Sequence, residues 1–432
     1  MRVLLISENR CRENMVPWPL GVAWVASSVR ARGHEVAGLD LMFADDPAAA
    51  VAEAVREFAP DCIGFAVRNI DNQDMYANEF FLPEARGILD SVREVTDVPL
   101  VLGGAGFTIF PLECLDYFGL ELGVVGEGEA AFPALLSALE AGVDPSTLPG
   151  LAVARGGLRQ VNPIDLSFDF RRSPPPDREA FDVSGYRWVP GQGPPFVSNV
   201  QSRRGCPLHC IYCSSPLVEG RTIRCREPQD VADELESLEK EHGVRTVIFA
   251  DSHFNHPAEY AYELCELIRH KRLAMKWSAG ANPLFFDAGL FEAMREAGCF
   301  AVSIGNEHGS DAMLQSLRKD FSKEDVSRSV KAARAAGLEV NCFLLLGGPG
   351  ETRESVDESI ALMDELAPEI VRVTVGIRIF PGCGLERVAV EEGFISEGQS
   401  LLEPAFYLER RAKPWLYKKM VEVTAARKGW FL

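Results

Sequence analysis

Residues 202–216 read Ser-Arg-Arg-Gly-Cys-Pro-Leu-His-Cys-Ile-Tyr-Cys-Ser-Ser-Pro and place three cysteines within eight positions. These are Cys206, Cys210 and Cys213, and no nearby fourth cysteine completes a set of four ligands. Thiolates are soft ligands that suit zinc or iron-sulfur clusters, but zinc motifs usually carry a second pair of cysteines. An accidental group of thiols or a zinc clip stays open as the simpler interpretation. The sharper hypothesis is a 4Fe-4S cluster with one iron open to a small molecule.

The composition limits the classes of protein to which the chain can belong. With 432 residues it is too long for one ordinary core, so two domains are expected. The net charge of -19 argues against a nucleic-acid groove, because such grooves need clustered Lys and Arg. No apolar run is long enough for a membrane span, and the first residues are typical of a β-strand rather than a signal peptide. The eleven cysteines are spread along the chain, which favours reduced thiols in a cytoplasmic protein.

The first 140 residues alternate short apolar runs with longer amphipathic stretches. This alternation predicts a parallel, doubly wound, Rossmann-like sheet with any ligand at the carboxyl edge of the strands. The expected strands are Val3–Ile6, Val36–Leu41, Cys62–Val67, Pro99–Leu102 and Leu122–Val125, and the expected helices lie near 19–32, 47–58, 78–94, 109–117 and 128–140.

Regular alternation stops near residue 145 and resumes at Phe196. The stretch between them contains the segments 171–177 and 190–195, which are rich in Pro or Gly and predict an interdomain connector with a few short strands. Six further strand and helix units predict a partial (β/α)6 barrel with its chemistry at the carboxyl ends of the strands. The six expected strands are Phe196–Ser202, Val244–Ala250, Ala274–Ala279, Ala301–Ile304, Glu339–Leu346 and Ile370–Arg378. The predicted domains are therefore 1–143, a connector at 144–195, the barrel at 196–385 and a short helical extension at 386–432.

The spacing Cys-x-x-x-Cys-x-x-Cys, with Tyr212 directly before the last cysteine, resembles the signature of radical S-adenosylmethionine (radical SAM) enzymes. The resemblance implies that the three cysteines hold a 4Fe-4S cluster whose open iron chelates the amino and carboxylate groups of S-adenosylmethionine. It also implies that Tyr212 packs beside the adenine. The reduced cluster of this family cleaves the sulfonium and gives a 5'-deoxyadenosyl radical.

Later stretches resemble further motifs of the same family across residues 196–410. In Gly-Asn-Glu-His-Gly-Ser at 305–310, Glu307 takes the place of a glutamate that helps to hold the cofactor, and His308 replaces the usual serine. The turn Gly-Gly-Pro-Gly-Glu-Thr at 347–352 resembles the fifth-strand turn near the adenine, which implicates Gly347, Gly348 and Glu351. The alternative interpretation is a helix cap for Glu351 and a helix cap or a salt bridge for Glu307.

Three more residues are candidates for a catalytic role. Cys383 stands in Pro-Gly-Cys-Gly-Leu at 381–385, where threonine is common in the family, and residues 404–407 resemble a short C-terminal motif. Asp251 and His253 end the second predicted barrel strand, where the family often carries acidic or amide residues near the cluster. A purely structural role for His253 is the competing interpretation.

The first 140 residues resemble the cobalamin-binding domain that precedes the barrel in one large class of these enzymes. The resemblance rests on residues 19–23 and 32–36 and on two glycine-bearing loops, in which Gly103, Gly104, Gly126 and Glu127 are expected to approach the corrin and its nucleotide tail. Alone, such glycines also fit tight turns, and their spacing is not the GxGxxG of a dinucleotide site. The loop after the first strand has no histidine to ligate cobalt, unlike the mutases, which is compatible with methyl transfer or with a domain that has lost cobalamin.

The stretch Arg-Asn-Ile-Asp-Asn at 68–72 follows the third strand and is unusually polar for a strand edge. Arg68 is a candidate to bind a carboxylate or phosphate, and Asn69 and Asn72 are candidates to donate hydrogen bonds to corrin amides. An Asx-rich turn that uses its own hydrogen bonds is the alternative.

Together these resemblances favour a cobalamin-dependent radical SAM methyltransferase that methylates an unactivated carbon of a small molecule. The expected cofactors are a 4Fe-4S cluster, S-adenosylmethionine and cobalamin, and the expected partner is an electron donor such as flavodoxin or ferredoxin. The alternatives are radical SAM chemistry without methylation, such as rearrangement, cyclisation or transfer of another fragment, and a non-catalytic metal or redox sensor.

Overall fold

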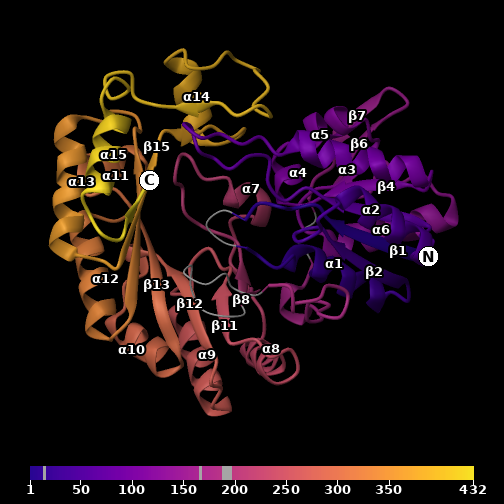
Figure 1. The fold of residues 1–432 in the computed structure, drawn as a ribbon, viewed down its shortest axis with the longest axis horizontal. Coiled ribbons are helices and arrows are strands. Elements are labelled where there is room, and N and C mark those ends of the chain that lie inside the picture. Colours follow the sequence, from indigo (N-terminus) through magenta and orange to yellow (C-terminus); the bar gives the residue numbers. More distant parts are fainter. Residues whose placement is uncertain (13–15, 165–167, 187–196) are drawn as a thin grey trace. The chain divides into compact units, whose positions relative to one another are not determined.

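The structure is a computed structural model that describes residues 1–12, 16–164, 168–186 and 197–432, and contacts divide it into two compact units (Figure 1). Of the described residues, 1–72, 79–186 and 214–220 belong to the first unit. Residues 73–78, 197–213 and 221–432 belong to the second. The segment 190–195 and Phe196, on which parts of the sequence prediction depend, lie outside the described residues.

A parallel sheet forms the centre of the first unit. Its strands run in the order β2-β1-β3-β4-β5, and the antiparallel strands β6 and β7 extend it at one edge. The bounds are β1 (Arg2–Ser7), β2 (Glu35–Asp40), β3 (Cys62–Ala66), β4 (Leu100–Gly103), β5 (Leu122–Val124), β6 (Leu151–Arg155) and β7 (Leu158–Val161). The central strands are apolar along their length because helices cover both faces of the sheet. The doubly wound fold predicted for this part of the chain is confirmed.

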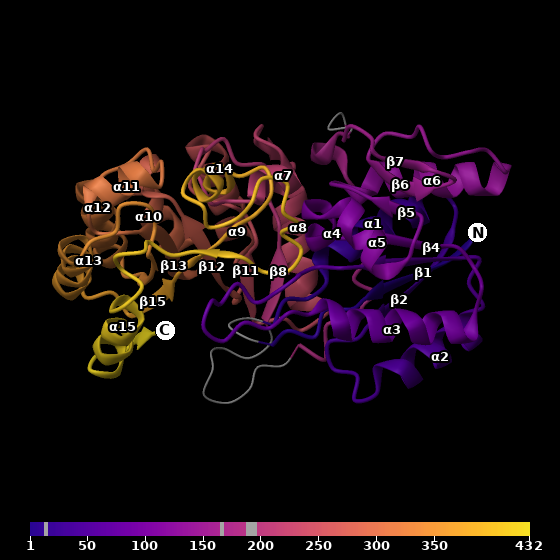
Figure 2. The same cartoon turned by 90° about the horizontal axis from the view of Figure 1, so that it is seen from above.

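Helices pack on the two faces of this sheet. In Figure 2, α2 and α3 lie on one side of the strands, and α1 and α6 lie on the other. The bounds are α1 (Leu20–Ala31), α2 (Pro47–Phe58), α3 (Leu82–Val95), α4 (Ala105–Ile109), α5 (Pro111–Phe118) and α6 (Gly128–Ala141). The helix expected near 109–117 corresponds to α5, and the short helix α4 precedes it. The two are separate because Phe110 leaves the helical conformation and Pro111 starts a new first turn.

The strand order of the first unit reverses at β1, since β2 lies on one side of it and β3 on the other. In open α/β sheets this switch point makes a crevice at the carboxyl ends of the two diverging strands. The loops after β1 and β3 therefore define the ligand-binding edge of this unit. The stretch 144–195, expected as a connector, contributes β6 and β7 to the same sheet.

The second unit is built on seven parallel strands in the order β8-β11-β12-β13-β14-β15-β18. The bounds are β8 (Val197–Val200), β11 (Thr246–Phe249), β12 (Lys276–Ala281), β13 (Cys299–Glu307), β14 (Glu339–Leu346), β15 (Ile370–Val375) and β18 (Trp430–Phe431). Figure 1 shows α9, α10, α12 and α13 along the outside of this curved sheet. The first six strands follow one another both in sequence and in the sheet, which confirms the predicted partial barrel.

The remaining elements of the second unit are short or connect the strands. Its longer helices are α8 (Pro228–Lys240), α9 (Ala258–Lys271), α10 (Ala288–Glu296), α12 (Lys323–Ala335), α13 (Arg353–Leu366) and α15 (Leu416–Ala425). The shorter elements are β9 (Arg203–Arg204), β10 (Arg224–Cys225), α11 (Asp311–Ser316), β16 (Ile377–Arg378), α14 (Gly384–Glu391) and β17 (Phe406–Tyr407), and α7 (Ser215–Glu219) groups with the first unit. Across the described ranges, no helix is both long and apolar enough to cross a bilayer.

One predicted strand, 370–378, is divided. Gly376 adopts a φ of 86°, which ends β15 and turns the chain into β16. β16 then pairs antiparallel with β17, so the C-terminal motif at 404–407 is fixed beside the end of the barrel.

Candidate iron-sulfur and cofactor site

A short antiparallel ladder closes the base of the loop that carries the three cysteines. Arg203 pairs with Cys225 and Arg204 pairs with Arg224. The next residue, Gly205, has a φ of 94°, and a Cβ atom there would lie 2.1 Å from the carbonyl oxygen of Thr222. Only glycine fits this close crossing. The loop therefore leaves the barrel through a fixed two-stranded ladder, which we call the neck, and not through a flexible hinge.

Asp251 supports this neck from the carboxyl end of β11. Its Oδ1 accepts hydrogen bonds from the amides of Ser202 (2.7 Å) and Arg203 (3.2 Å), and its Oδ2 accepts one from Ser202 Oγ at 2.5 Å. The Arg203 Nε atom lies 3.4 Å from Asp251 Oδ2, and both side chains are buried. Burial raises the pKa of Asp251, although Arg203 and the hydrogen bonds oppose the rise. Asp251 was a candidate catalytic residue, and these contacts instead give it the geometry of a positioning residue.

Further contacts fix the distal part of the cysteine loop. The Ile211 amide donates to Leu317 (3.2 Å), and the Leu385 amide donates to the Ile211 carbonyl (2.7 Å). The Cys383 thiol lies 3.3 Å from the carbonyl oxygen of Cys213, to which it donates. Burial, followed by the nearby Cys213 and Glu386, raises the pKa of Cys383 to about 12, so the thiol stays protonated at neutral pH. The structure thus places this predicted catalytic residue against the loop backbone as a hydrogen-bond donor.

The three cysteines of the loop form a set of free thiols that influence one another. None of the eleven cysteines forms a disulfide bond. Burial raises the pKa values of Cys206 and Cys210, and the charges of the neighbouring thiolates raise them further. Within the described ranges, no group of three or more His, Cys, Asp or Glu residues is arranged to hold a single metal ion. A 4Fe-4S cluster spreads its ligands over different irons, and a set of three soft thiolates on one loop fits that group better than it fits one zinc ion.

Glu307, at the end of β13, lies beside this loop and adopts a φ of 56°, which is uncommon for a residue other than glycine. Its carboxylate is paired with the ammonium of Lys319, and Nζ lies 3.1 Å from Oε1. Burial raises the pKa of Tyr212 well above its usual value, and a hydrogen bond to Glu307 adds to the rise. The structure therefore brings Tyr212 and Glu307 together. Lys319 was missed, because no motif in the sequence marks it.

His308 and Glu351 connect the loops after β13 and β14. The imidazole Nε2 lies 3.1 Å from Glu351 Oε2, and Nδ1 lies 2.9 Å from Ser359 Oγ. Burial disfavours the charged carboxylate, but hydrogen bonds from His308, Ser355 and the Gly347 amide outweigh it and lower the pKa of Glu351. The first turn of α13 is capped by Thr352. Glu351 therefore connects the loops after β13 and β14. It is not the residue that caps α13, which was the alternative interpretation.

The glycines of the turn after β14 lie so close to neighbouring atoms that a side chain would not fit easily. Gly347 has a φ of 97°, and a Cβ atom there would lie 2.4 Å from Leu408 Cδ1. Its amide donates to Glu351 Oε2 at 2.9 Å. At Gly348 a Cβ atom would approach Leu317 at 3.2 Å. The turn is therefore held close to both the C-terminal segment and the loop after α11.

His253 follows β11, and one nitrogen of its buried ring makes no hydrogen bond. Its side chain is buried, and Nε2 has no hydrogen-bond partner. Burial, followed by the charges of His256 and Arg203, lowers the pKa of His253 to about 4, so the ring is neutral at pH 7. The ring of Phe285 lies 5.3 Å away and stacks on His256. A neutral imidazole with a free nitrogen is suited to hydrogen-bond a ligand.

At the edge of the first unit, several predicted cofactor residues follow the strand ends. Arg68 and Asn69 follow β3 at the switch point, next to Glu8 and Asn9 after β1, and the Arg68 amide donates to Glu8 Oε1 at 3.1 Å. Burial raises the pKa of Glu8 to about 8, and the Nδ2 atom of the buried Asn9 has no partner. The sequence interpretation missed Glu8 and Asn9, although two polar residues directly after a buried strand were the available signal.

The other predicted residues of this edge serve mainly to shape it. Asn72 closes a local loop, since its Oδ1 accepts the Glu79 amide at 3.0 Å. Gly104 has a φ of 98° and its missing Cβ would lie 2.4 Å from the Val67 carbonyl oxygen, whereas Gly103 is unhindered. Gly126 donates its amide to Thr108 Oγ1 at 2.9 Å, and the buried Glu127 precedes α6.

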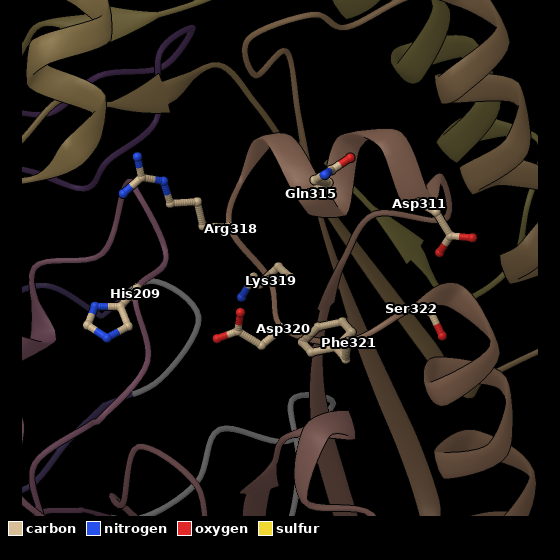
Figure 3. A pocket seen from close by; sticks show the side chains of 8 residues that line it. All are labelled: His209, Asp311, Gln315, Arg318, Lys319, Asp320, Phe321 and Ser322. Atoms are coloured by element: carbon tan, nitrogen blue, oxygen red, sulfur yellow. The ribbon is translucent and has the colours of Figure 1, made fainter.

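A pocket of about 350 Å³ opens beside the cysteine loop in the second unit (Figure 3). One wall carries His209, which lies between Cys206 and Cys210, and the opposite wall comes from α11 and the segment after it. The lining residues are His209, Asp311, Gln315, Arg318, Lys319, Asp320, Phe321 and Ser322. Most of these lining residues have polar or charged side chains, and two of them, His209 and Lys319, belong to the cysteine loop and to the Glu307–Lys319 pair.

Comparisons with known proteins agree with this geometry. The model of the radical SAM superfamily matches residues 200–363, and that of the B12 binding domain matches residues 15–136. The chain is 28% identical over 378 residues to an uncharacterised methyltransferase of Pyrococcus horikoshii, covering 87% of this chain and 79% of that one. It is 26% identical over 450 residues to the tryptophan 2-C-methyltransferase of Streptomyces laurentii, covering 90% and 74%.

A solved structure extends the comparison to three dimensions. The radical S-adenosylmethionine methyltransferase TsrM from Kitasatospora setae, with cobalamin and a [4Fe-4S] cluster bound, matches with a TM-score of 0.78 and 28% identity over 90% of this chain and 75% of that one. The chain therefore carries an N-terminal B12-binding domain and a C-terminal radical SAM domain, and its relatives include cobalamin-dependent radical SAM methyltransferases.

Proposed function

We propose that this enzyme transfers a methyl group from S-adenosylmethionine, by way of cobalamin, to an unactivated carbon of a small organic molecule. The observation that carries the proposal is the fixed loop of three free thiols in a chain that also has a B12-binding domain. When bound, the cluster supplies an electron to S-adenosylmethionine and cobalamin carries the methyl group. The protein's part is to bind these groups, orient them and exclude water.

In the second unit, we assign cluster binding to Cys206, Cys210 and Cys213. Tyr212 lies on the cysteine loop and Glu307 ends β13, and we assign the first to the adenine and the second to holding S-adenosylmethionine. The turn at Gly347 and Gly348 supplies a close backbone approach, and Glu351 fixes that turn through its bond to the Gly347 amide.

In the first unit, the cofactor edge is formed by the loops after β1, β3, β4 and β5. Glu8 is largely protonated at pH 7, because burial raises its pKa to about 8, so its carboxyl group can donate as well as accept. The unpaired Nδ2 of Asn9 is a second buried donor. Such donors match the many amide carbonyls at the rim of a corrin. Arg68 and Asn69 flank them, while Gly103, Gly104, Gly126 and Glu127 shape the adjacent loops.

The experiment that tests this function uses protein purified with cobalamin available and reconstituted with iron and sulfide without oxygen. The purified protein should show corrin absorption bands. Incubation with methyl-labelled S-adenosylmethionine and a reductant should give a labelled product, S-adenosylhomocysteine from the methyl donor, and 5'-deoxyadenosine from a second S-adenosylmethionine whose radical takes the hydrogen atom from the substrate carbon. Tryptophan is the first substrate to test, because a relative is a tryptophan 2-C-methyltransferase, and a metabolite extract follows. A protein without corrin bands would refute the cobalamin assignment. Formation of 5'-deoxyadenosine without a labelled product would favour the non-methylating alternative.

Variants of the loop provide the matched control. Cys210→Ala should lower the iron content and abolish turnover, because a thiolate ligand is lost. Cys265→Ala removes a buried thiol in α9, outside the loop, and should retain the iron. Equal iron content in the two variants would contradict the assignment.

We also infer a small low-potential electron-transfer protein, such as flavodoxin or ferredoxin, as the physiological reductant, and a cytoplasmic location. Eleven cysteines without a disulfide bond fit a reducing compartment. Reduced flavodoxin, used in place of a chemical reductant such as dithionite, should sustain turnover in the methylation assay. No turnover with either flavodoxin or ferredoxin would contradict the first inference.

A further inference from the structure

Lys319 is a buried cation beside the cysteine loop. Its side chain is 5% exposed and that of its partner Glu307 is 16% exposed, with 3.1 Å between Nζ and Oε1. The ammonium also lies 5.3 Å from the ring centroid of Tyr212 and 5.7 Å from that of Phe321. A buried lysine is costly unless its charge is compensated, so this position has a specific electrostatic environment.

The backbone fixes the direction of this side chain. Arg318 adopts a left-handed φ of 54°, and the Lys319 amide donates to Leu314 at 2.8 Å, so the chain turns sharply after α11. Two residues before Lys319, the Leu317 carbonyl accepts the amide of Ile211, which lies between Cys210 and Cys213. The segment is thus tied to the cysteine loop itself. In Figure 3 the ammonium end of Lys319 points toward the loop that carries His209.

We propose that Lys319 is a positioning residue for charge, which raises the reduction potential of the cluster bound by Cys206, Cys210 and Cys213. The inference rests on the proposed function, because it requires a cluster on this loop. Reduction adds one electron, taken from dithionite in the experiment below, and breaks no bond. A cation fixed next to the thiolates stabilises that added negative charge, and the interaction is strong because little water screens it.

Glu307 has the opposite electrostatic effect and also holds the cation in place. Its carboxylate disfavours added negative charge on the cluster, while its bond to Nζ fixes Lys319 in the buried position. Removing the Lys319 charge should therefore lower the reduction potential, and removing the Glu307 charge should raise it. When both charges are removed, the two shifts should largely cancel. A merely structural role for the ion pair predicts no such signed pattern.

The test is a redox titration, followed by electron paramagnetic resonance, of reconstituted full-length protein without S-adenosylmethionine. Lys319→Met should make one-electron reduction about tenfold less favourable, equivalent to ~59 mV for a one-electron couple. Glu307→Gln should shift the potential upward, and the double variant should return toward wild type. Lys319→Arg should retain the wild-type value because it keeps the charge. Lys331→Met removes an exposed lysine that pairs with Glu365 and should change nothing.

The outcomes separate this inference from the proposed function. If wild-type protein assembles no cluster, the proposed function fails. If the cluster assembles but Lys319→Met matches Lys331→Met in potential, only the present inference is overturned. If Lys319→Met cannot retain iron, Glu307→Gln decides alone: an upward shift supports the inference and an unchanged potential overturns it.

Discussion

His308 Nε2 lies 3.1 Å from Glu351 Oε2, and both side chains are wholly buried. The pair joins the residue after Glu307 to the turn that begins at Gly347. His308 stands where the motif that the sequence resembles has serine, and its ring bridges the loops after β13 and β14.

The first prediction concerns this bridge. His308→Ala leaves the Glu351 carboxylate buried without its main side-chain donor, which should cost on the order of 2 kcal/mol of folding free energy. S-adenosylmethionine should bind more weakly, because both loops lose a fixed position, while the iron content stays unchanged. Equilibrium dialysis and iron analysis measure the two effects. Glu354→Gln, at an acidic residue in the first turn of α13, is the control, and equal affinity in both variants would contradict the prediction.

A second prediction concerns the neck of the cysteine loop. Asp251→Asn places an amide group where three donors from Ser202 and Arg203 converge on a carboxylate. The loop should lose its fixed geometry, and iron per chain after reconstitution should fall well below the wild-type value. Asp230→Asn, at an exposed site in α8, should reconstitute normally. Normal iron content in Asp251→Asn would show that the neck does not depend on this carboxylate.

His253 should make folding sensitive to acid. Its pKa is lowered from 6.5 to about 4 by burial, so between these values the unfolded chain binds more protons than the folded protein. Stability should therefore be complete above pH 6.5 and decline as the pH falls toward 4. Urea unfolding from pH 7 to 4.5 should show a smaller loss for His253→Gln than for wild type. Parallel pH profiles for the two proteins would rule out this contribution.

Glu8 should have the opposite dependence. Burial raises its pKa from 4.5 to about 8, so the folded protein binds more protons than the unfolded chain between these values. Stability should fall as the pH rises through this window. Glu8→Gln mimics the protonated form, and its advantage over wild type should grow from pH 6 to pH 9 in urea unfolding without cobalamin. Glu53→Gln, exposed on α2, should follow the wild-type profile, and an identical profile for Glu8→Gln would refute the assignment.

Much of the fold was predictable because it depends on local patterns. The β14 bounds agree with the strand expected at 339–346, since the apolar residues Val340 and 342–346 mark it in the sequence. Differences arose where a single residue changes the backbone direction, as at Gly376, or where a strand pairs with one distant in the chain, as β6 pairs with β5. Neither a strand partner nor a sharp turn is specified by the period of hydrophobic residues.

The sequence by itself determined the order of strands and helices, the two-part organisation and the loop of three cysteines, because these features depend on residues that are near one another in the chain. Only the tertiary structure decided which side chains meet: Asp251 with Ser202, His308 with Glu351, and Lys319 with Glu307. The physical reason is that parallel strands bring their carboxyl ends to one edge. Residues far apart in sequence then become neighbours in a buried site. The low dielectric there strengthens the interactions of each charge and raises the free-energy cost of each unpaired hydrogen-bonding group.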